Sequence, residues 1–199
     1  MTRKTTVWIV CFLGLLLGAF SPARATDLSL FVSDEDLSFQ AQQQIYTYAG
    51  NPLYIGGGLF YSEKDNRDSW LFNGRLLVKD LYQKTYNLGL GFETLVGHVK
   101  PSVGSDVFSV GFYFCGDVNL EKTPSKLPIS IETTFFYSPP ILSFADTKRV
   151  FTWNLSAYFH INTTAAVGIR YQLFDINLDN PGGQSWDNST LMLGAKISF

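Results

Sequence analysis

Apolar side chains recur at every second position in segment after segment of this chain, from about residue 27 to the C-terminus. The last segment shows the pattern most clearly. One of its faces holds Leu191, Leu193, Ala195, Ile197 and Phe199, and the other holds Thr190, Met192, Gly194, Lys196 and Ser198. Side chains alternate between the two faces of a strand, so a period of two predicts β-strands. No apolar run after residue 25 is as long as a membrane helix, and the sequence predicts an all-β fold.

The two faces of the predicted strands differ in chemistry. From residue 53 onward the apolar faces carry no charge, whereas the opposite faces collect Gly, Asn, Ser, Gln and nearly every strand charge. Aromatic residues gather at segment ends, namely Tyr61, Trp70, Tyr137, Phe151 and Phe199. An apolar band with aromatic girdles and a polar reverse face is typical of a transmembrane β-barrel. Lipid offers the backbone no hydrogen bonds, so such strands must close into an antiparallel up-and-down barrel.

Alternation alone does not tell the inside of a barrel from its outside, so a soluble barrel or sandwich is the alternative. Almost every apolar face carries large aromatic rings, and their combined volume would exceed that of a small barrel interior. The C-terminal aromatic residue, Phe199, also lies on the apolar face. These features favour a transmembrane barrel. Charged residues are 16% of the chain, against roughly 25% in soluble domains. The 16% aromatic content excludes a disordered chain, and the chain is not a basic nucleic-acid binder.

Residues 1–25 have the layout of a secretory signal peptide. Arg3 and Lys4 precede an apolar run from Val7 to Phe20, and Ala23 and Ala25 form an A-x-A cleavage pattern. Cleavage would leave a single domain, 26–199. Its 12 basic and 17 acidic residues (15 Lys and Arg less three in the leader) give a charge of −5. One cysteine remains, Cys115, so the fold must hold without an internal disulfide.

The connections between segments alternate in length, which allows the strands to be counted. Short connections are predicted at 48–52, 80–85, 121–126 and 162–163, and longer ones at 63–69, 98–106, 138–149 and 175–188. Outer-membrane barrels have short periplasmic turns, long outer loops and an even strand number. Eight strands follow residue 53, and the turn at 33–36 predicts a further hairpin of 27–32 and 37–45. We therefore expect ten strands, with an eight-strand barrel and a loose N-terminal segment as the alternative.

The C-terminal strand resembles the assembly signal of outer-membrane barrels. Gly194, Ile197 and Phe199 match that pattern, whereas Met192 departs from it at the polar position. The resemblance implies a partner, the barrel assembly machinery, which would bind this strand by edge pairing. The mature chain also resembles the YfaZ family of small outer-membrane proteins in residues 58–61, 136–139, 142–144 and 167–171. That family is described as porin-like, with no assigned reaction.

Six charged residues are predicted to face the lumen: Arg75, Lys79, Glu93, Glu132, Arg170 and Lys196. Buried charges must be paired or hydrated, so one hypothesis is a core filled by ion pairs. The other is a narrow, mildly cationic pore, for which inward glycines such as Gly89 and Gly111 would leave space. The pattern favours a filled or very narrow core.

No catalytic, cofactor-binding or metal-binding residue is predicted. The two histidines, His98 and His160, are far apart in sequence. His98 lies near Ser102 and Asp106, which suggests acyl chemistry, but no nucleophile-elbow sequence is present. Two histidines and one cysteine also make no ligand cluster, and no cofactor is expected.

The sequence therefore predicts a non-enzymatic protein of the cell outer membrane, either structural or a narrow porin-like passage for small solutes. The alternatives are an outer-membrane lipid-modifying enzyme and a soluble periplasmic ligand-binding barrel. The expected partners are outer-membrane lipids and the assembly machinery, with no nucleic acid. The solute, the open or closed state and the oligomeric state are left open.

Overall fold

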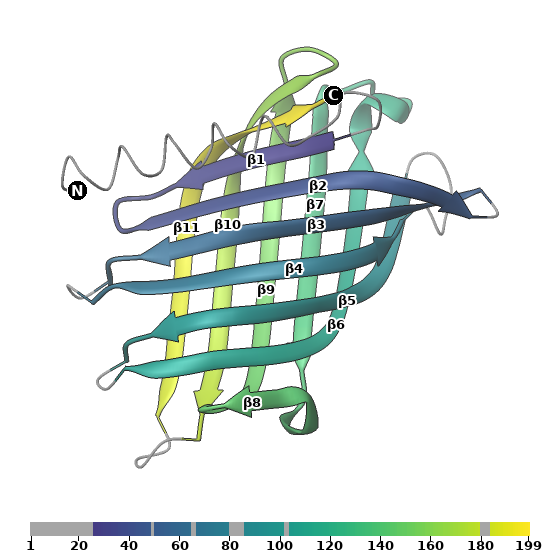
Figure 1. Ribbon diagram of the computed structural model, residues 1–199. Helices are drawn as coiled ribbons and strands as arrows, with labels where there is room; N and C mark the ends of the chain where they lie inside the picture. Colours follow the sequence, from purple (N-terminus) through teal and green to yellow (C-terminus); the bar gives the residue numbers. More distant parts are fainter. Residues whose placement is uncertain (1–25, 49, 65–66, 80–85, 102–103, 180–183) are drawn as a thin grey trace.

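The computed structural model describes residues 26–48, 50–64, 67–79, 86–101, 104–179 and 184–199, and the predicted signal peptide, 1–25, lies outside these ranges. Within them the chain is almost entirely strand (Figure 1). The strands are β1 (Thr26–Val32), β2 (Asp36–Tyr48), β3 (Asn51–Ser62), β4 (Ser69–Val78), β5 (Tyr86–Val99), β6 (Ser105–Asn119), β7 (Ile129–Ser138), β8 (Ser143–Ala145), β9 (Thr147–His160), β10 (Ala165–Leu178) and β11 (Ser185–Ser198). Two short 3₁₀ helices are η2 (Leu120–Lys122) and η3 (Pro140–Leu142). None of the described helices is long and apolar enough to cross a membrane.

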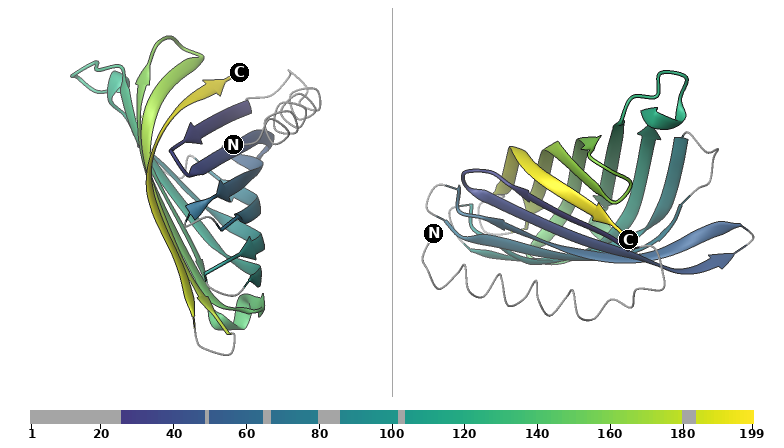
Figure 2. Two further views of the ribbon diagram at one scale, coloured as in Figure 1. Left: turned by 90° about the vertical axis from the view of Figure 1, so that its left-hand side faces the viewer. Right: turned by 90° about the horizontal axis from the view of Figure 1, so that it is seen from above.

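Ten of the described strands form a closed antiparallel barrel. Each pairs with its neighbours in chain order, β7 pairs with β9, and β11 returns to pair with β1 from Ser198–Asp27 to Leu193–Val32. Strands β1–β6 form one wall and strands β7 and β9–β11 form the other; the two walls cross at a steep angle and approach each other at one end (Figures 1 and 2). The prediction of ten strands is confirmed. The alternative of eight is wrong, because β1 and β2 are paired along β1 from Thr26 to Val32.

The apolar faces of the strands point outward along the middle of the wall. Phe92, Leu90, Ile169 and Leu193 are 48–66% exposed, while their strand neighbours Glu93, Arg170 and Met192 are buried inside. Outward rings also contact each other across strands, as Phe135 does with the stacked ring of Trp153. The barrel thus has an apolar exterior and a polar interior at this level. This is the arrangement of a barrel that spans a membrane.

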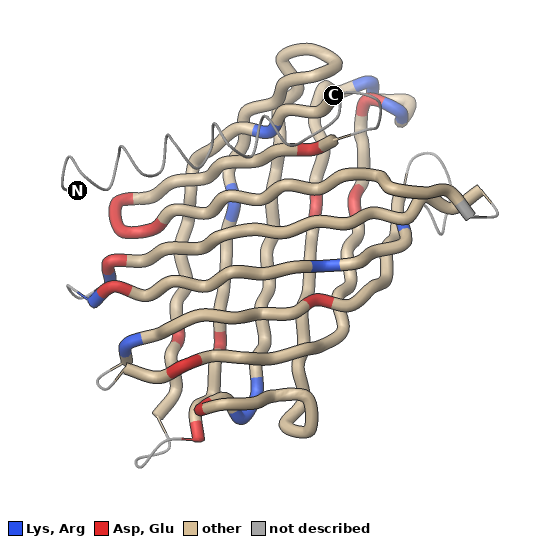
Figure 3. The backbone as a smooth tube through the Cα atoms, in the orientation of Figure 1, with Lys and Arg blue, Asp and Glu red and all other residues tan. Residues whose placement is uncertain are grey.

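The barrel has two distinct ends. We call the end where Thr26 and Phe199 exchange backbone hydrogen bonds the terminal end; the connections β2–β3, β4–β5, β6–β7 and β9–β10 also lie there. The opposite end, with the other connections, is the loop end. Most charged residues lie at these two ends, with few along the strands between them (Figure 3). The described turns of the loop end are rich in carboxylates, among them Asp34, Glu35, Glu63 and Asp68.

The strands extend further toward the loop end than the sequence predicts. Much of the predicted connections 98–106, 138–149 and 175–188 is strand, including the last four residues of β10 and the first four of β11. The reason is that apolar and polar residues still alternate there, but the apolar residues now point inward and the polar residues outward. On β10, Ile169 faces outward, but Ile176 and Leu178 are buried inside, and Asp175 lies outward and pairs with Arg149 at 3.0 Å.

A short strap completes the wall where β7 is too short. β7 ends at Ser138, opposite the middle of β6, and the chain then folds through η3 into β8, which pairs with Val107–Ser109 of β6. Ser138 fixes this corner because its Oγ donates to the carbonyls of Val110 at 2.8 Å and Leu142 at 3.2 Å. The motif at 136–144 therefore has a structural explanation, since it turns the chain back onto β6.

The barrel lumen as candidate functional site

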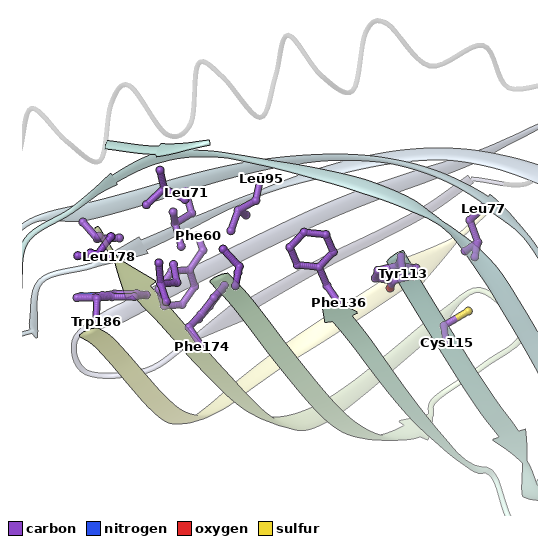
Figure 4. Close-up of a cluster of buried hydrophobic side chains, with 14 residues drawn as sticks. Phe60, Leu71, Leu77, Leu95, Tyr113, Cys115, Phe136, Phe174, Leu178 and Trp186 are labelled. Carbon is purple, nitrogen blue, oxygen red and sulfur yellow. The ribbon is translucent and has the colours of Figure 1, made fainter. Parts of the chain in front are cut away.

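The loop half of the lumen is filled by apolar side chains that come from both walls. Phe60 on β3, Phe174 on β10 and Trp186 on β11 form the centre, with ring centroids 4.6 to 6.4 Å apart (Figure 4). Further buried members of this cluster, the apolar cap, are Leu71, Leu95, Val99, Val107, Phe136, Val150, Ile176 and Leu178. Because these residues are nearly inaccessible, the cap closes the lumen at the loop end.

A polar layer centred on Arg75 lies below the cap. Arg75 on β4 donates from Nη1 to the Tyr113 hydroxyl at 2.8 Å and from Nη2 to Gln40 Oε1 at 3.2 Å. Its Nη1 also lies 3.8 Å from Glu93 Oε2, and both side chains are about 95% buried. Asn73 Nδ2 donates to the same carboxylate oxygen at 3.0 Å. A buried charge of this kind is tolerated because it is paired and hydrogen-bonded.

Arg170 on β10 has a different environment. Its Nε donates to Ser156 Oγ at 3.0 Å and its Nη2 to the Tyr158 hydroxyl at 3.2 Å. Its guanidinium carbon lies 4.0 Å from the centre of the Phe31 ring, a cation–π contact. Within the described ranges no carboxylate lies within 4 Å of Arg170. Neutral partners therefore hold this buried charge.

The terminal end of the lumen holds the remaining predicted charges. Lys196 Nζ lies 3.4 Å from Glu132 Oε2 and 3.7 Å from Asp27 Oδ2, so one ammonium bridges two carboxylates. Lys79 Nζ lies 5.3 Å from the centre of the Tyr54 ring. Asp117, which the sequence analysis did not single out, accepts a hydrogen bond from Asn87 at 2.9 Å. The described structure thus has all six of the predicted charges on the inner side of the wall.

The described residues of this polar part of the lumen line two small hollows. Each has a volume of about 30 Å³. The first lies between the cap and the polar layer, and Asn154 and Gln172 line it. The second lies toward the terminal end, and its lining includes Arg170, Glu132 and Lys196. Gln40 and Arg75 line both hollows, so the polar layer separates them. Each hollow has room for a water molecule or a small ion.

The inward glycines do not leave the space that the pore hypothesis required. A Cβ on Gly111 would lie 2.2 Å from the carbonyl oxygen of Tyr137 on the neighbouring strand. At Gly89 the added atom would meet the Cys115 thiol at 2.6 Å and Leu77 at 3.0 Å. These glycines allow close approach of backbone and side chains, and their neighbours occupy the space.

The histidines lie at opposite ends of the barrel. His98 Nδ1 lies 2.8 Å from Asp106 Oδ1 at the loop end, where Asp106 is largely exposed, and Ser102 lies outside the described residues. His160 Nε2 lies 2.9 Å from Ser130 Oγ at the terminal end. The described residues contain no group of three or more His, Cys, Asp or Glu that could hold a metal ion.

The three residues of the predicted assembly signal lie where β11 meets β1. Ile197 and Phe199 are exposed on the outer face, and the Phe199 amide donates to the Thr26 carbonyl at 2.9 Å. Gly194 has a packing role, because a Cβ there would lie 2.1 Å from the Leu30 carbonyl oxygen and 2.6 Å from the Phe31 ring.

The similarity of this chain to known proteins is low. No family model and no curated protein matches the chain. Among solved structures, the outer membrane channel DcaP of Acinetobacter baumannii is 10% identical with a TM-score of 0.43, over 88% of this chain and 62% of DcaP. The chain thus spans less than two thirds of that protein. The KdgM porin is 10% identical with a TM-score of 0.41, over 88% and 99% of the two chains. Ail of Yersinia pestis is 12% identical with a TM-score of 0.25, over 88% and 99%.

Sequence reasoning missed the neutral residues that organise the lumen. Gln40, Tyr113 and Ser156 hold the two arginines, and the apolar cap closes the loop half. A signal for the cap is present in the sequence. The alternating apolar residues occupy odd positions up to Leu173 and even positions from Phe174 onward, where they continue as Ile176 and Leu178. No pattern within one strand pairs Arg75 with Tyr113, because the two residues come from β4 and β6.

Proposed function

We propose that this protein is a non-enzymatic outer-membrane β-barrel whose lumen is sealed by its own side chains, and that its role is structural. The observation that carries the proposal is the pairing of an apolar exterior with a lumen closed at two levels. Phe92 and Leu193 are 58% and 66% exposed on the outside, whereas Phe136, Val150 and Ile176 are fully buried inside. A small barrel filled by side chains spans a membrane without providing a channel.

The proposed orientation places the loop end outside the cell and the terminal end in the periplasm. Support comes from the two faces of β10: the outward apolar run ends at Leu173, and Asp175 and Asn177 follow on the same face. Charged residues are disfavoured on a lipid-facing wall, so this change marks the membrane surface. The cap is then a water-excluding core in the part of the barrel that projects beyond the membrane.

A second candidate function is a narrow passage for small solutes. The observation that favours it is the stacking of two hollows on either side of Arg75. A passage would require both the Arg75 layer and the cap to move aside. The assignment to a YfaZ-like family is part of the same proposal, and its support is the motif at 136–144, which forms the strap from β7 to β8.

The location is tested by cell fractionation combined with a heat-dependent shift in gel mobility. We expect the protein in the outer-membrane fraction, with an unheated band that migrates differently from the boiled one. Recovery of the folded chain in the soluble periplasm would overturn the membrane location and favour a soluble ligand-binding barrel.

The state of the lumen is tested by conductance in planar bilayers. The wild-type barrel should give no regular conductance steps, because the cap and the Arg75 layer both block the path. A matched variant, Phe60→Ala combined with Phe174→Ala, thins the cap and leaves the polar layer intact, and we expect it to remain silent. Regular steps from the wild type would favour the passage, and hydrolysis of a lipid substrate that is lost in His98→Ala would favour the enzyme.

A further inference from the structure

We propose that the hollow at the terminal end of the lumen is a binding site for a small anion, held by two guanidinium N–H groups, Nε of Arg75 and Nη1 of Arg170. The inference extends the proposed function by giving the sealed lumen a ligand class. Both arginines line this hollow, from strands on opposite walls of the barrel.

The first argument is the burial of donors that lack acceptors. Arg75 is 7% exposed and Arg170 is 3% exposed. Within the described residues neither Arg75 Nε nor Arg170 Nη1 has a hydrogen-bond partner. A buried donor without a partner is unfavourable, and more so when the group is charged. A ligand that accepts from both groups would remove this cost.

The second argument is the geometry that keeps these two donors free. Arg75 is held through its Nη atoms by Tyr113 and Gln40, which leaves Nε without an acceptor. Arg170 is held through Nε and Nη2 by Ser156 and Tyr158, which leaves Nη1. The guanidinium group is planar and rigid, so fixing two of its nitrogens also fixes the direction of the third.

The third argument is the distribution of charge around the hollow. Its lining holds four cationic side chains, Arg75, Lys79, Arg170 and Lys196, and two carboxylates, Asp27 and Glu132. Both carboxylates contact Lys196. The Glu93 carboxylate pairs with Arg75 but lines the other hollow, and Asp117 lines neither. Among the described residues, Arg170 and Lys79 are thus the two cations of the lining that no carboxylate contacts within 4 Å, and Arg170 is the more deeply buried of the two.

A small anion fits these conditions better than a cation or a large solute. Water can accept the same hydrogen bonds, but an anion also offsets the buried charge of Arg170, and charge-assisted hydrogen bonds are about twice as strong as neutral ones. A volume of about 30 Å³ suits a monatomic anion and excludes a sugar or a nucleotide. Chloride is the simplest probe of this class.

The test measures chloride binding by the ³⁵Cl NMR line width of the folded protein in detergent micelles, with chloride replaced by gluconate at constant ionic strength. We expect saturable excess broadening for the wild type. Arg170→Met should weaken binding at least tenfold. Ser29→Leu should also weaken it, because Ser29 is buried, lines the hollow and carries no charge. The matched control is Lys148→Met, which removes an exposed charge at the loop end and should bind as the wild type does.

The absence of excess broadening in the wild type would overturn the proposal and assign water to the hollow. Equal broadening in the wild type, Arg170→Met and Ser29→Leu would overturn it as well. The heat-dependent gel shift shows which variants fold, and if Arg170→Met does not, Ser29→Leu decides. Binding does not require conduction. A silent bilayer without chloride binding would contradict only the anion site, and chloride binding together with bilayer steps would contradict only the sealed lumen.

Discussion

The loop half and the terminal half of the lumen are built from opposite chemistry inside one continuous wall. In the loop half, Phe60, Phe174 and Trp186 pack as the core of a soluble protein does. At this level the outward position Asp175 on β10 is charged, whereas Trp70 and Phe72 on β4 are outward and apolar. In the terminal half, outward positions are apolar and the interior holds Arg75, Arg170 and Lys196. The inversion follows the solvent: where water surrounds the wall, burying apolar groups inside is favourable, and where lipid surrounds it, that driving force is lost.

Because of this contrast, different interactions stabilise the two halves. The cap gains from removing aromatic surface from water, so its stability follows buried area. The polar layer gains no stability from buried apolar area. Its side chains must instead form hydrogen bonds and ion pairs with one another inside the barrel. The variants below separate the two halves, in order of decreasing effect on the free energy of unfolding.

Removal of Arg75 should have the largest effect. Arg75→Met leaves the Glu93 carboxylate, 4% exposed, with Asn73 as its remaining hydrogen-bond donor. An unpaired buried charge typically costs about 3–5 kcal/mol, and we expect a loss of about 4 kcal/mol. The measurement is reversible urea unfolding of the barrel in lipid vesicles.

The control for Arg75 is a double-mutant cycle with Glu93→Gln. The double variant should lose less than the sum of the two single losses, because no charge is then left unpaired. Strict additivity would show that the two side chains do not interact, contrary to the 3.8 Å contact.

Truncation in the cap should have the next effect. Phe174 is 6% exposed, with its ring centre 4.6 Å from that of Phe60 and 5.7 Å from that of Trp186. Phe174→Ala should lower the free energy of unfolding by about 3 kcal/mol in the same assay, since it removes apolar area and leaves a cavity. Phe174→Leu, which keeps most of the volume, should lose less than half as much. Equal losses would mean that the cap is not tightly packed.

Strand number and strand phase could be predicted from the sequence, because the phase follows local alternation and the number follows from the even strand count of such barrels. The six charges predicted to face the lumen lie on the inner side of the wall. The requirement for an even strand number predicts the first hairpin, and β1 pairs with β2 as expected. The extent of β10 and β11 was underestimated because Asp175 to Asn188 is rich in polar residues, although Ile176, Leu178 and Trp186 continue the alternation in the opposite phase. The contacts of Arg75 with Gln40 and Tyr113 depend on register across β2, β4 and β6, which no single strand encodes.

A charge on the outer wall tests which medium surrounds the terminal half. Leu90 is 55% exposed on the outer face of β5. Leu90→Arg should cost about 2 kcal/mol of stability in lipid vesicles, since a lipid-facing arginine near the middle of the membrane is disfavoured. The matched control Ser185→Arg lies on the outer face of β11 opposite Asn177, beyond the apolar band, and its cost should be close to zero. A neutral Leu90→Arg would mean that water contacts this wall.

The smallest effect on stability is expected at the C-terminal residue, where folding and assembly can be separated. Phe199 is 66% exposed, and its hydrogen bonds to Thr26 come from the backbone. Phe199→Ala should therefore change the free energy of unfolding by no more than about 0.5 kcal/mol. If the side chain is read by the assembly machinery, the same variant should reach the outer membrane of cells in clearly reduced amounts. Gly194→Ala is the contrasting change, because a Cβ there would lie 2.1 Å from the Leu30 carbonyl oxygen and should weaken the barrel in vesicles as well. A Phe199→Ala protein that is fully assembled in cells would exclude this residue from the recognised signal.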